Sequence, residues 1–473
     1  MESPPVRSLS ERVWRALGGA DSLHGSVTEV GPEALLPSVY DVTALATATV
    51  GAATLAVAEL LAHRAGEPLR AVRVDRRAAS AAFLGERLFT PQGWERPPIW
   101  DPIAGDYLAR DGWIRLHTNY RDHRAAVEKV LGPVADRAGV TGAVAGWSAT
   151  ELQDAVVAAG GCAAAMNDRE RWLASPAGTA TAGEPIVEVA VVGPGQGLAG
   201  LAPDEPPLTG VRVLDLTRVI AGPVCTRFLA AYGADVLRID PPGFAEVPAL
   251  LPETTAGKHR AALDLRDPAG RTVFEGLLRQ ADVLVTGLRP GALANLGYHD
   301  GRLRAEYPRL VTASLDAYGW SGPWAGRRGF DSLVQMSSGI AAAGSDSTAA
   351  GADSTAAAGP SRPVPLPAQA LDHGTGYLLA AAVCRALTRV TTTGERTGLR
   401  ASLIATANLL AGYPTPEGLQ IRPPDWSAAD TEATRTAWGP ARRVPIPGRI
   451  TGVETRLPVD AGPLGLHTPR WTA

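Results

Sequence analysis

The stretch from Val211 to Asp240 restricts the possible folds of this chain more than any other segment. It opens with the apolar, β-branched run VRVLDL, which predicts a buried strand. Pro223 suits the first turn of a helix and Gly233 suits its end, so a helix is expected between them. The run ADVLRID then predicts a second buried strand. Because a strand, a helix and a strand follow one another, this stretch indicates a parallel βαβ unit.

The same alternation continues to residue 412. A short strand, LDL, is expected near Leu263, followed by a helix over 270–279 and by the strands ADVLVTG and RLVTASLDAYG. The segment LDHGTGYLLAAAVCRALTR then predicts a helix with Asp372 at its start. We therefore predict an α/β fold with a parallel sheet.

The first 200 residues show a weaker pattern. The run DPIAGDYLARDGWIRLHTNY predicts two paired strands with a turn at Asp111 and Gly112. Helices are expected over 121–131 and 149–159, and a strand over 187–192. These elements are consistent with the smaller α/β domain.

Residues 42–61 are nearly uncharged over about the length of a membrane span. They are mostly Ala, Thr, Gly and Val, which favour insertion weakly, and the polar pair His63 and Arg64 follows at once. We expect a buried core helix here and no membrane partner.

Composition shifts divide the chain into five segments. The Gly- and Pro-rich stretch over 193–207 is the best domain boundary, and the low-complexity stretch over 341–363 is expected to be a flexible surface insertion. We predict an N-terminal extension, a first module, a linker, a second module and a Pro-rich closing tail, with the bounds 1–34, 35–195, 196–206, 207–412 and 413–473.

Two stretches, which begin at Ala56 and Ala381, are similar in layout. Each predicts a helix that ends near an Arg, a turn with Gly and Glu, a short strand and an Ala-rich helix. Counted back from these turns, Asp41 and Asp372 lie at similar distances. We interpret the two stretches as a possible internal duplication.

Several functional classes are disfavoured. A formal net charge of −3 with scattered arginines argues against a nucleic-acid partner. The three widely spaced cysteines and an N-terminus without the apolar core of a signal peptide favour a reducing, cytoplasmic setting. Eight dispersed histidines predict no metal site. The GQGLAG run at 195–200 fits a dinucleotide-binding motif, but prolines follow it and exclude the helix that such a motif needs.

Asp372 has two possible roles. An Asp at the start of a helix is a favoured N-cap, because its carboxylate accepts hydrogen bonds from free backbone N–H groups. However, Gly374 and Gly376 lie in the first turns, where each costs roughly 1 kcal/mol of helix stability. They could let an acyl group approach the backbone, where their amides would stabilise an oxyanion.

Five ordered blocks between Leu208 and Leu403 resemble the N-terminal half of the family III CoA-transferases, the CaiB/BaiF-like group that contains formyl-CoA transferase and α-methylacyl-CoA racemase. The blocks are GVRVLDLTRVIAGPVCTRFLAAYGADVLRID, GKHRAALDLRDPAGR, ADVLVTGLRPGALANLGY, PRLVTASLDAYGWSGPWAGRRGFDSLVQMSSGIA and LDHGTGYLLAAAVCRAL. The run that begins at Asp101 resembles the small-domain segment of the family, and GPLGLHTPRW resembles its C-terminal signature. The resemblance implies a Rossmann-like parallel sheet domain plus a smaller α/β domain. It also implies that a C-terminal-like half precedes an N-terminal-like half.

This resemblance implies a site and a reaction. Asp372 matches the catalytic aspartate, which forms an aspartyl anhydride and an aspartyl-CoA thioester while CoA moves from an acyl-CoA to a carboxylic acid. It also implies coenzyme A as substrate and product, and an interlocked homodimer. Lys258 is interpreted either as a phosphate contact or as a solvated side chain. The candidate CoA contacts are Ala221, Leu263, Asp264, Leu265, Arg266, Leu288, Arg289, Tyr318 and Gly319.

Some family positions differ in this sequence. Ile220 stands where transferases often have Gln, and Pro241 stands where formyl-CoA transferase has an Arg that contacts CoA; Gly287, Asn295 and Asp316 replace other polar contact residues. These changes leave open a non-catalytic member that acts as a binding or assembly partner. Phe330, before Asp331, replaces the acid–base His of the racemases, which disfavours the third possibility, an acyl-CoA racemase or isomerase.

Overall fold

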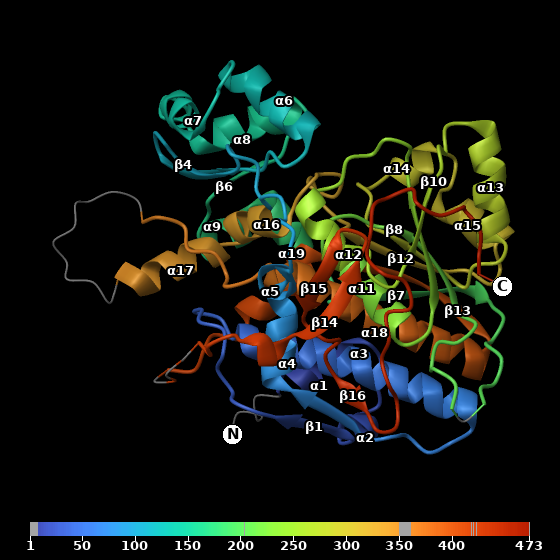
Figure 1. The fold of residues 1–473 in the computed structure, drawn as a ribbon. Coiled ribbons are helices and arrows are strands. Elements are labelled where there is room, and N and C mark those ends of the chain that lie inside the picture. Colours follow the sequence, from blue (N-terminus) through green and yellow to red (C-terminus); the bar gives the residue numbers. More distant parts are fainter. Residues whose placement is uncertain are drawn as a thin grey trace.

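A seven-stranded sheet forms the centre of the molecule, with its strands in the order β10-β9-β8-β11-β12-β13-β7 (Figure 1). The computed structural model describes residues 8–202, 204–349, 361–417, 419, 421 and 423–472. The strands of this sheet are β7 (Val187–Pro194), β8 (Arg212–Leu216), β9 (Asp235–Asp240), β10 (His259–Ala262), β11 (Val283–Thr286), β12 (Val311–Asp316) and β13 (Glu395–Ser402).

Six of these strands run parallel, and β7 joins β13 antiparallel at one edge. The connections that follow β8 and β11 leave the middle of the sheet in opposite directions, which makes this the switch point of a doubly wound fold. The predicted α/β fold with a parallel sheet is therefore confirmed. The connecting helices are α11 (Ala221–Ala231), η1 (Pro248–Leu250), α12 (Leu251–Thr254), α13 (Pro268–Leu278), α14 (Ala292–Asn295), α15 (Asp300–Glu306), α16 (Asp331–Ser337), α17 (Ile340–Ala349) and α18 (Ala370–Thr393).

The predicted strand LDL is wrong, because β10 ends at Ala262. The backbone N–H of Leu263 still donates to the carbonyl of Asp240 at 2.9 Å, but the chain then turns towards α13. Asp267 is the N-cap of that helix, and its carboxylate accepts a hydrogen bond from the backbone N–H of Gly270. The capped turn therefore ends the strand pairing.

Helix α3 (Val42–Ala65) and helix α18 pack against each other in the main hydrophobic core (Figure 1). Among the described residues, α3 is the one helix long and apolar enough to cross a membrane, but 94% of its most apolar window is buried inside the protein. Its neighbours are apolar side chains of α18 and of α1 (Leu9–Ala16). The prediction of a buried core helix is confirmed.

The two helices also match in length and ends. Each has 24 residues and stops at a left-handed glycine, Gly66 or Gly394. The N-cap residues are Asp41 in α3 and Gln369 in α18. Because the helices are equally long, Asp41 corresponds to Gln369, and Asp372 corresponds to Ala44. The expected match between Asp41 and Asp372 is therefore wrong, and the first module carries no counterpart of Asp372.

Strand pairs join segments that are far apart in the chain. Strand β7, at the end of the first module, pairs with β13 of the second module. Strand β16 (Arg449–Ile450) of the closing tail pairs antiparallel with β2 (Val72–Asp75) of the first module, which runs parallel to β1 (Val27–Val30). Residues 35–195 therefore pack against 207–412.

A small domain sits above the carboxyl ends of the large sheet (Figure 1). It contains the predicted strand pair, but the turn lies at Arg110 and Asp111, because Gly112 is already the first residue of β5 and pairs with Ala109. The small domain has an apolar core of its own. Its elements are β4 (Gly105–Ala109), β5 (Gly112–Leu116), α6 (Arg121–Leu131), α7 (Arg137–Val144), α8 (Ala149–Ala158) and β6 (Ala163–Ala165).

Other short elements surround these layers. The 193–207 stretch packs against the ends of α3 and α18, where Arg64 donates hydrogen bonds to the carbonyls of Ala199 and Pro207. Of the expected surface insertion, residues 341–349 are helical and 350–360 lie outside the described residues. The remaining elements are α2 (Asp21–His24), α4 (Arg76–Phe83), α5 (Gly85–Leu88), β3 (Thr90–Pro91), α9 (Arg169–Ala174), α10 (Pro176–Thr181), α19 (Leu403–Ala411), η2 (Ala428–Asp430), β14 (Glu432–Thr436) and β15 (Gly439–Arg443).

Candidate active site

A cavity of about 420 Å³ opens at the carboxyl ends of the parallel strands. Five strands, β8, β9, β11, β12 and β13, each contribute residues at or just beyond their ends, which is where doubly wound sheets bind ligands. The small domain adds Tyr120, Asp122 and His123 from the start of α6. A larger cavity, of about 770 Å³, lies at the other end of α18 and contains none of these strand ends.

Asp372 lines this cavity from the first turn of α18. It is the third residue of the helix and is only 7% exposed. Gln369 is the N-cap, and among the described residues no hydrogen-bond donor contacts the Asp372 carboxylate, so the N-cap alternative is wrong. As predicted, Asp372 and Ala221, in the turn after β8, lie in the same cavity.

Asp331, at the start of α16, caps the helix instead. Its Oδ2 accepts hydrogen bonds from the backbone N–H groups of Leu371 and Asp372, at 2.8 and 3.0 Å. Gln335 donates to the other oxygen and also accepts from the N–H of Leu366. The sequence showed Asp331 only as a neighbour of the missing racemase His, because a cap from a distant helix leaves no local signal.

The acidic groups around Asp372 affect its ionisation. Burial raises the pKa of Asp372 well above its usual range, and the carboxylates of Asp331 and Glu86 add to this effect. Glu86 comes from the first module and contacts Nε2 of His373 at 3.1 Å. Because Asp331 is stabilised as an anion by two backbone amides, Asp372 is the partner that holds a proton most readily.

The glycines of α18 have a packing role, and the oxyanion role of their amides stays a prediction. Both are buried inside the helix. A Cβ on Gly376 would lie 2.5 Å from the carbonyl oxygen of Ala221, and one on Gly374 would lie 3.1 Å from Thr406. The glycines therefore allow α11 and α19 to approach α18, which brings Asp372 to the turn after β8.

We expect Gly376→Ala to destabilise the protein by about 1–3 kcal/mol, because the added methyl group must push against backbone atoms of α11. Gly276→Ala is a matched control in α13, since a Cβ there meets no atom within 4 Å. The control should be neutral or stabilising by up to about 1 kcal/mol. Urea unfolding measures both, and equal stability of the two variants would contradict this packing role.

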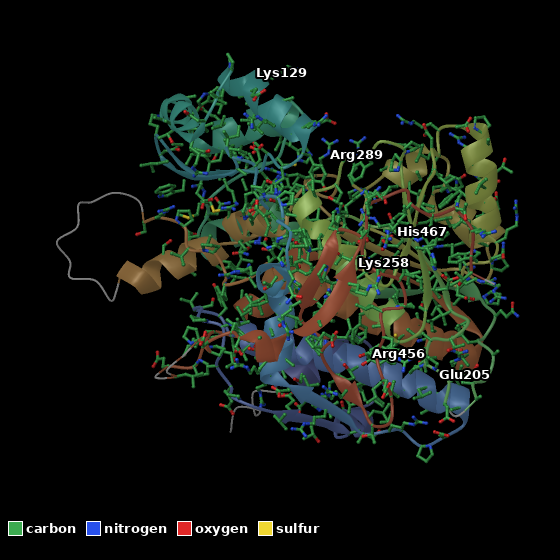
Figure 2. The ribbon with its side chains drawn as sticks, in the orientation of Figure 1. Lys129, Glu205, Lys258, Arg289, Arg456 and His467 are labelled. Atoms are coloured by element: carbon green, nitrogen blue, oxygen red, sulfur yellow. The ribbon has the colours of Figure 1, made fainter. Side chains whose placement is uncertain are left out.

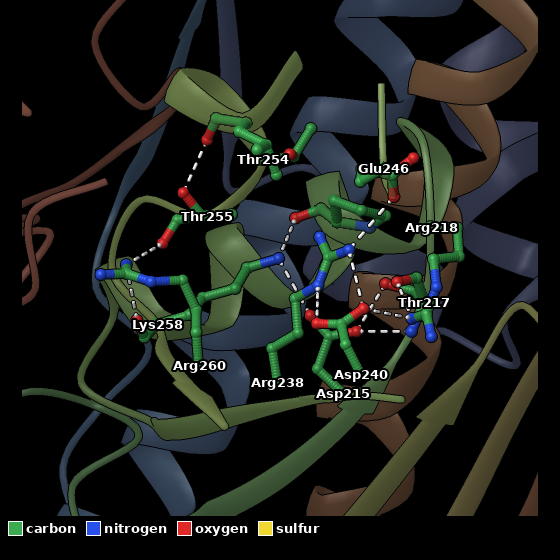
Figure 3. A network of polar contacts seen from close by, with 12 residues as sticks. Asp215, Thr217, Arg218, Arg238, Asp240, Glu246, Thr254, Thr255, Lys258 and Arg260 are labelled. Carbon is green, nitrogen blue, oxygen red and sulfur yellow. Dashed lines mark hydrogen bonds and ion pairs between the residues drawn. The ribbon is translucent and has the colours of Figure 1, made fainter. Parts of the chain in front are cut away.

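The turn after β8 is strained and tied to buried charges. Val219 has a φ of +62°, which is unfavourable for a β-branched residue. Its backbone N–H donates to Glu246 at 3.2 Å, and Glu246 also accepts from the hydroxyl group of Tyr120 in the small domain. The fully buried Arg238 pairs with Glu246 as well (Figure 3). This network connects the docked small domain to the backbone at the cavity.

Lys258 belongs to the same buried network (Figure 3). Its Nζ lies 3.0 Å from Oδ2 of Asp215 and 3.1 Å from the carbonyl of Pro223, and neither charged side chain is exposed. Both earlier interpretations of Lys258, a phosphate contact or a solvated lysine, are therefore wrong. Burial lowers the pKa of Lys258 to about 8, whereas attraction to Lys258 and Arg238 overcomes burial and holds the pKa of Asp215 at about 2.

The candidate CoA contacts divide into two groups. Ala221, Leu288 and Arg289 line the cavity together with Asp372. The other six do not line it. Leu263 and Leu265 pack in the core beside β10, Asp264 and Arg266 form an exposed ion pair, and Tyr318 and Gly319 are covered by neighbouring side chains.

Arg289 lies between the small domain and α14 (Figure 2). Its side chain makes no hydrogen bond or ion pair to any described residue, whereas Arg218 is paired with Asp240 at 3.1 Å. Several other polar residues of the cavity carry no signal in the sequence, because they come together only in the folded chain. They are His123, Arg218, Arg327 and Arg328, together with Asp316, which had been noted only as a substituted position.

The profile of CoA-transferase family III matches residues 208–426. Residues 208–426 are therefore similar to this family. The family segment thus contains α18, Asp372 and most of the cavity. Among the described residues, no group of three or more His, Cys, Asp or Glu side chains could hold a metal ion.

Several curated proteins are similar to the family III segment. A formyl-CoA:oxalate CoA-transferase from Rhodopseudomonas palustris is 32% identical over 200 residues, which cover 40% of this chain and 44% of that protein. A probable CoA-transferase from Mycobacterium tuberculosis is 33% identical over 187 residues, or 37% and 22% of the two chains. The chain therefore spans less than half the length of these relatives. A solved CaiB/BaiF family protein from Brucella suis is 23% identical over 50% of this chain and 65% of its own, with a TM-score of 0.37.

Proposed function

We propose that this protein transfers CoA from an acyl-CoA to a carboxylic acid, with Asp372 as the nucleophile. The observation that carries the proposal is the position of Asp372. Its carboxylate is buried, accepts no hydrogen bond from a described residue and faces the cavity at the switch point of the sheet. In its ionised form, a carboxyl group held in this way is free to attack a bound thioester, and its raised pKa makes it a stronger nucleophile once the proton has left.

In this reaction CoA moves first from the donor acid to Asp372 and then from Asp372 to the acceptor acid. The Asp372 carboxylate attacks the carbonyl carbon of the donor thioester and expels CoA as a thiolate, which gives a mixed anhydride. The thiolate attacks the aspartyl carbonyl, which releases the donor acid and leaves an aspartyl-CoA thioester. The acceptor carboxylate repeats these steps in the opposite order, so the thioester bond energy is kept and Asp372 is restored.

Other residues of the cavity support this proposal. Arg289 has no protein partner among the described residues, so its guanidinium is available for a CoA phosphate. The ring of Phe330 is stacked on that of His117, with centroids 3.7 Å apart, and it cannot transfer a proton as a racemase base must. The two modules of one chain line the cavity, so this activity needs no residue from a second copy; a homodimer in a cytoplasmic setting stays a prediction.

Mass spectrometry tests the proposal directly. Wild-type protein incubated with a panel of acyl-CoAs should gain the mass of CoA minus one water, because the thioester replaces a carboxyl oxygen of Asp372. Hydroxylamine should then release the CoA and leave a hydroxamate on the peptide that contains Asp372. An adduct on another residue would contradict the assignment of the nucleophile, and the absence of any adduct with all donors would favour a non-catalytic binding protein.

A further inference from the structure

We propose that Asp316 donates a hydrogen bond from a neutral carboxyl group to a carbonyl oxygen of the thioester that binds beside Asp372. This inference rests on the proposed function and assigns a second acidic residue of the cavity to substrate binding. The family resemblance marked Asp316 only as a substituted position, so its role must follow from the geometry and charge around it.

Asp316 is the last residue of β12 and lines the cavity together with Asp372. It is 7% exposed. Its Oδ1 accepts a hydrogen bond from the backbone N–H of Gly319 at 3.0 Å, while its Oδ2 is buried and has no partner within the described parts of the chain. A buried carboxylate oxygen without a donor is costly, and that cost falls when the group carries a proton and finds an acceptor.

Burial and the charges near Asp316 also favour its protonated form. Burial raises the pKa of Asp316 to about 8, and the carboxylate of Glu184 adds to this effect. The N–H of Gly319 and the guanidinium of Arg400 oppose it without cancelling it. At neutral pH the carboxyl group is therefore mostly protonated. The other charged or titratable groups that line the cavity are Tyr120, Asp122, His123, Arg218, Arg289, Arg327, Arg328 and Asp372.

A neutral carboxyl group selects for a neutral acceptor. The arginines of the cavity suit the phosphates of CoA, whereas an O–H donor at Asp316 suits a carbonyl oxygen. A CoA thioester offers carbonyl oxygens in two places, the acyl group and the amides of the pantetheine arm. The experiment below separates these two sources.

The pH dependence of kcat/KM gives the first test. In the wild type it should fall as the pH rises through about 8, because Asp316 then loses its proton and places a negative charge in the cavity. Asp316→Asn keeps an uncharged donor of similar shape, so it should remove this alkaline decrease and keep activity at pH 7 within about threefold. Asp154→Asn, a change at an exposed position of α8, should leave the profile unchanged.

Binding of two unreactive CoA derivatives gives the second test. S-acetonyl-CoA carries a carbonyl group near the acyl position, and S-ethyl-CoA lacks it. Asp316→Ala should weaken binding of S-acetonyl-CoA at pH 7 by about tenfold, the loss of one hydrogen bond. Equal weakening of S-ethyl-CoA would identify a pantetheine amide as the acceptor, and unchanged S-ethyl-CoA binding would identify the acyl carbonyl.

Wild-type affinity of Asp316→Ala for both compounds would overturn the proposal, as would an unchanged alkaline decrease in Asp316→Asn. A loss of more than about a hundredfold in Asp316→Asn at pH 7 would also overturn it, because the anion would then be the working form. The binding assay uses no reactive thioester, so it tests Asp316 even if no adduct forms on Asp372. Melting temperatures of both variants show whether the fold is intact.

Discussion

Asp372→Asn is expected to abolish CoA transfer, with a fall in kcat/KM of at least about a thousandfold. The amide is nearly the same size as the carboxylate, but it lacks the anionic oxygen that attacks the thioester. The variant should form no CoA adduct. The loss of activity is measured by liquid chromatography of the acyl-CoAs as CoA moves between two acids. Exchange at near wild-type rates would contradict the mechanism.

The same substitution should not weaken the fold. The pKa of Asp372 is higher in the folded protein than in the unfolded chain. Asp372 therefore lowers the free energy of unfolding once the pH exceeds the pKa that this group has in the unfolded chain. Asp372→Asn should therefore melt at the same or a higher temperature than the wild type at pH 8, and this advantage should disappear near pH 4. Asp154→Asn is again the control. Asp331→Asn is not a suitable one, since Asp331 caps the helix that carries Asp372.

Lys258→Met should lower the free energy of unfolding by about 3–5 kcal/mol, because it leaves the buried charge of Asp215 without its partner. Urea denaturation at pH 7 measures this loss. Adding Asp215→Asn to the variant removes the unpaired charge and should restore part of the stability.

The only other lysine offers a matched control. Lys129 is exposed on α6, so Lys129→Met should change the stability by no more than about 0.5 kcal/mol. Similar stability of the Lys258 and Lys129 variants would show that the buried pair does not hold the turn after β8. A double variant less stable than Lys258→Met would show that Asp215 has a role apart from this pair.

Local sequence patterns were sufficient for most elements of the fold. Apolar runs and their Gly and Pro boundaries predicted the central strands β8, β9, β11 and β12. The assignment of Asp372 to the site came from the family resemblance. The pairing of β7 with β13 could not be predicted, because an edge strand with exposed valines carries no mark of its partner.

The electrostatics of the site were the least predictable part. Lys258 and Asp331 look like ordinary polar residues in the sequence, yet both are fully buried. What each contacts depends on chain segments dozens of residues away, such as the first turn of α18 for Asp331. Likewise, the ionisation of Asp316 depends on burial and on Glu184, neither of which is visible in its own segment.

The pairing of β16 with β2 sets an order for folding during synthesis. Strands β1 and β2 leave the ribosome among the first 75 residues, but β16, which closes their sheet, arrives only at residues 449–450. One edge of β2 therefore stays unpaired until residues 449–450 have been synthesised. An unpaired strand edge favours chaperone binding and aggregation. A truncation that removes only the last few dozen residues would thus leave β2, more than 370 residues earlier in the sequence, without its partner strand β16.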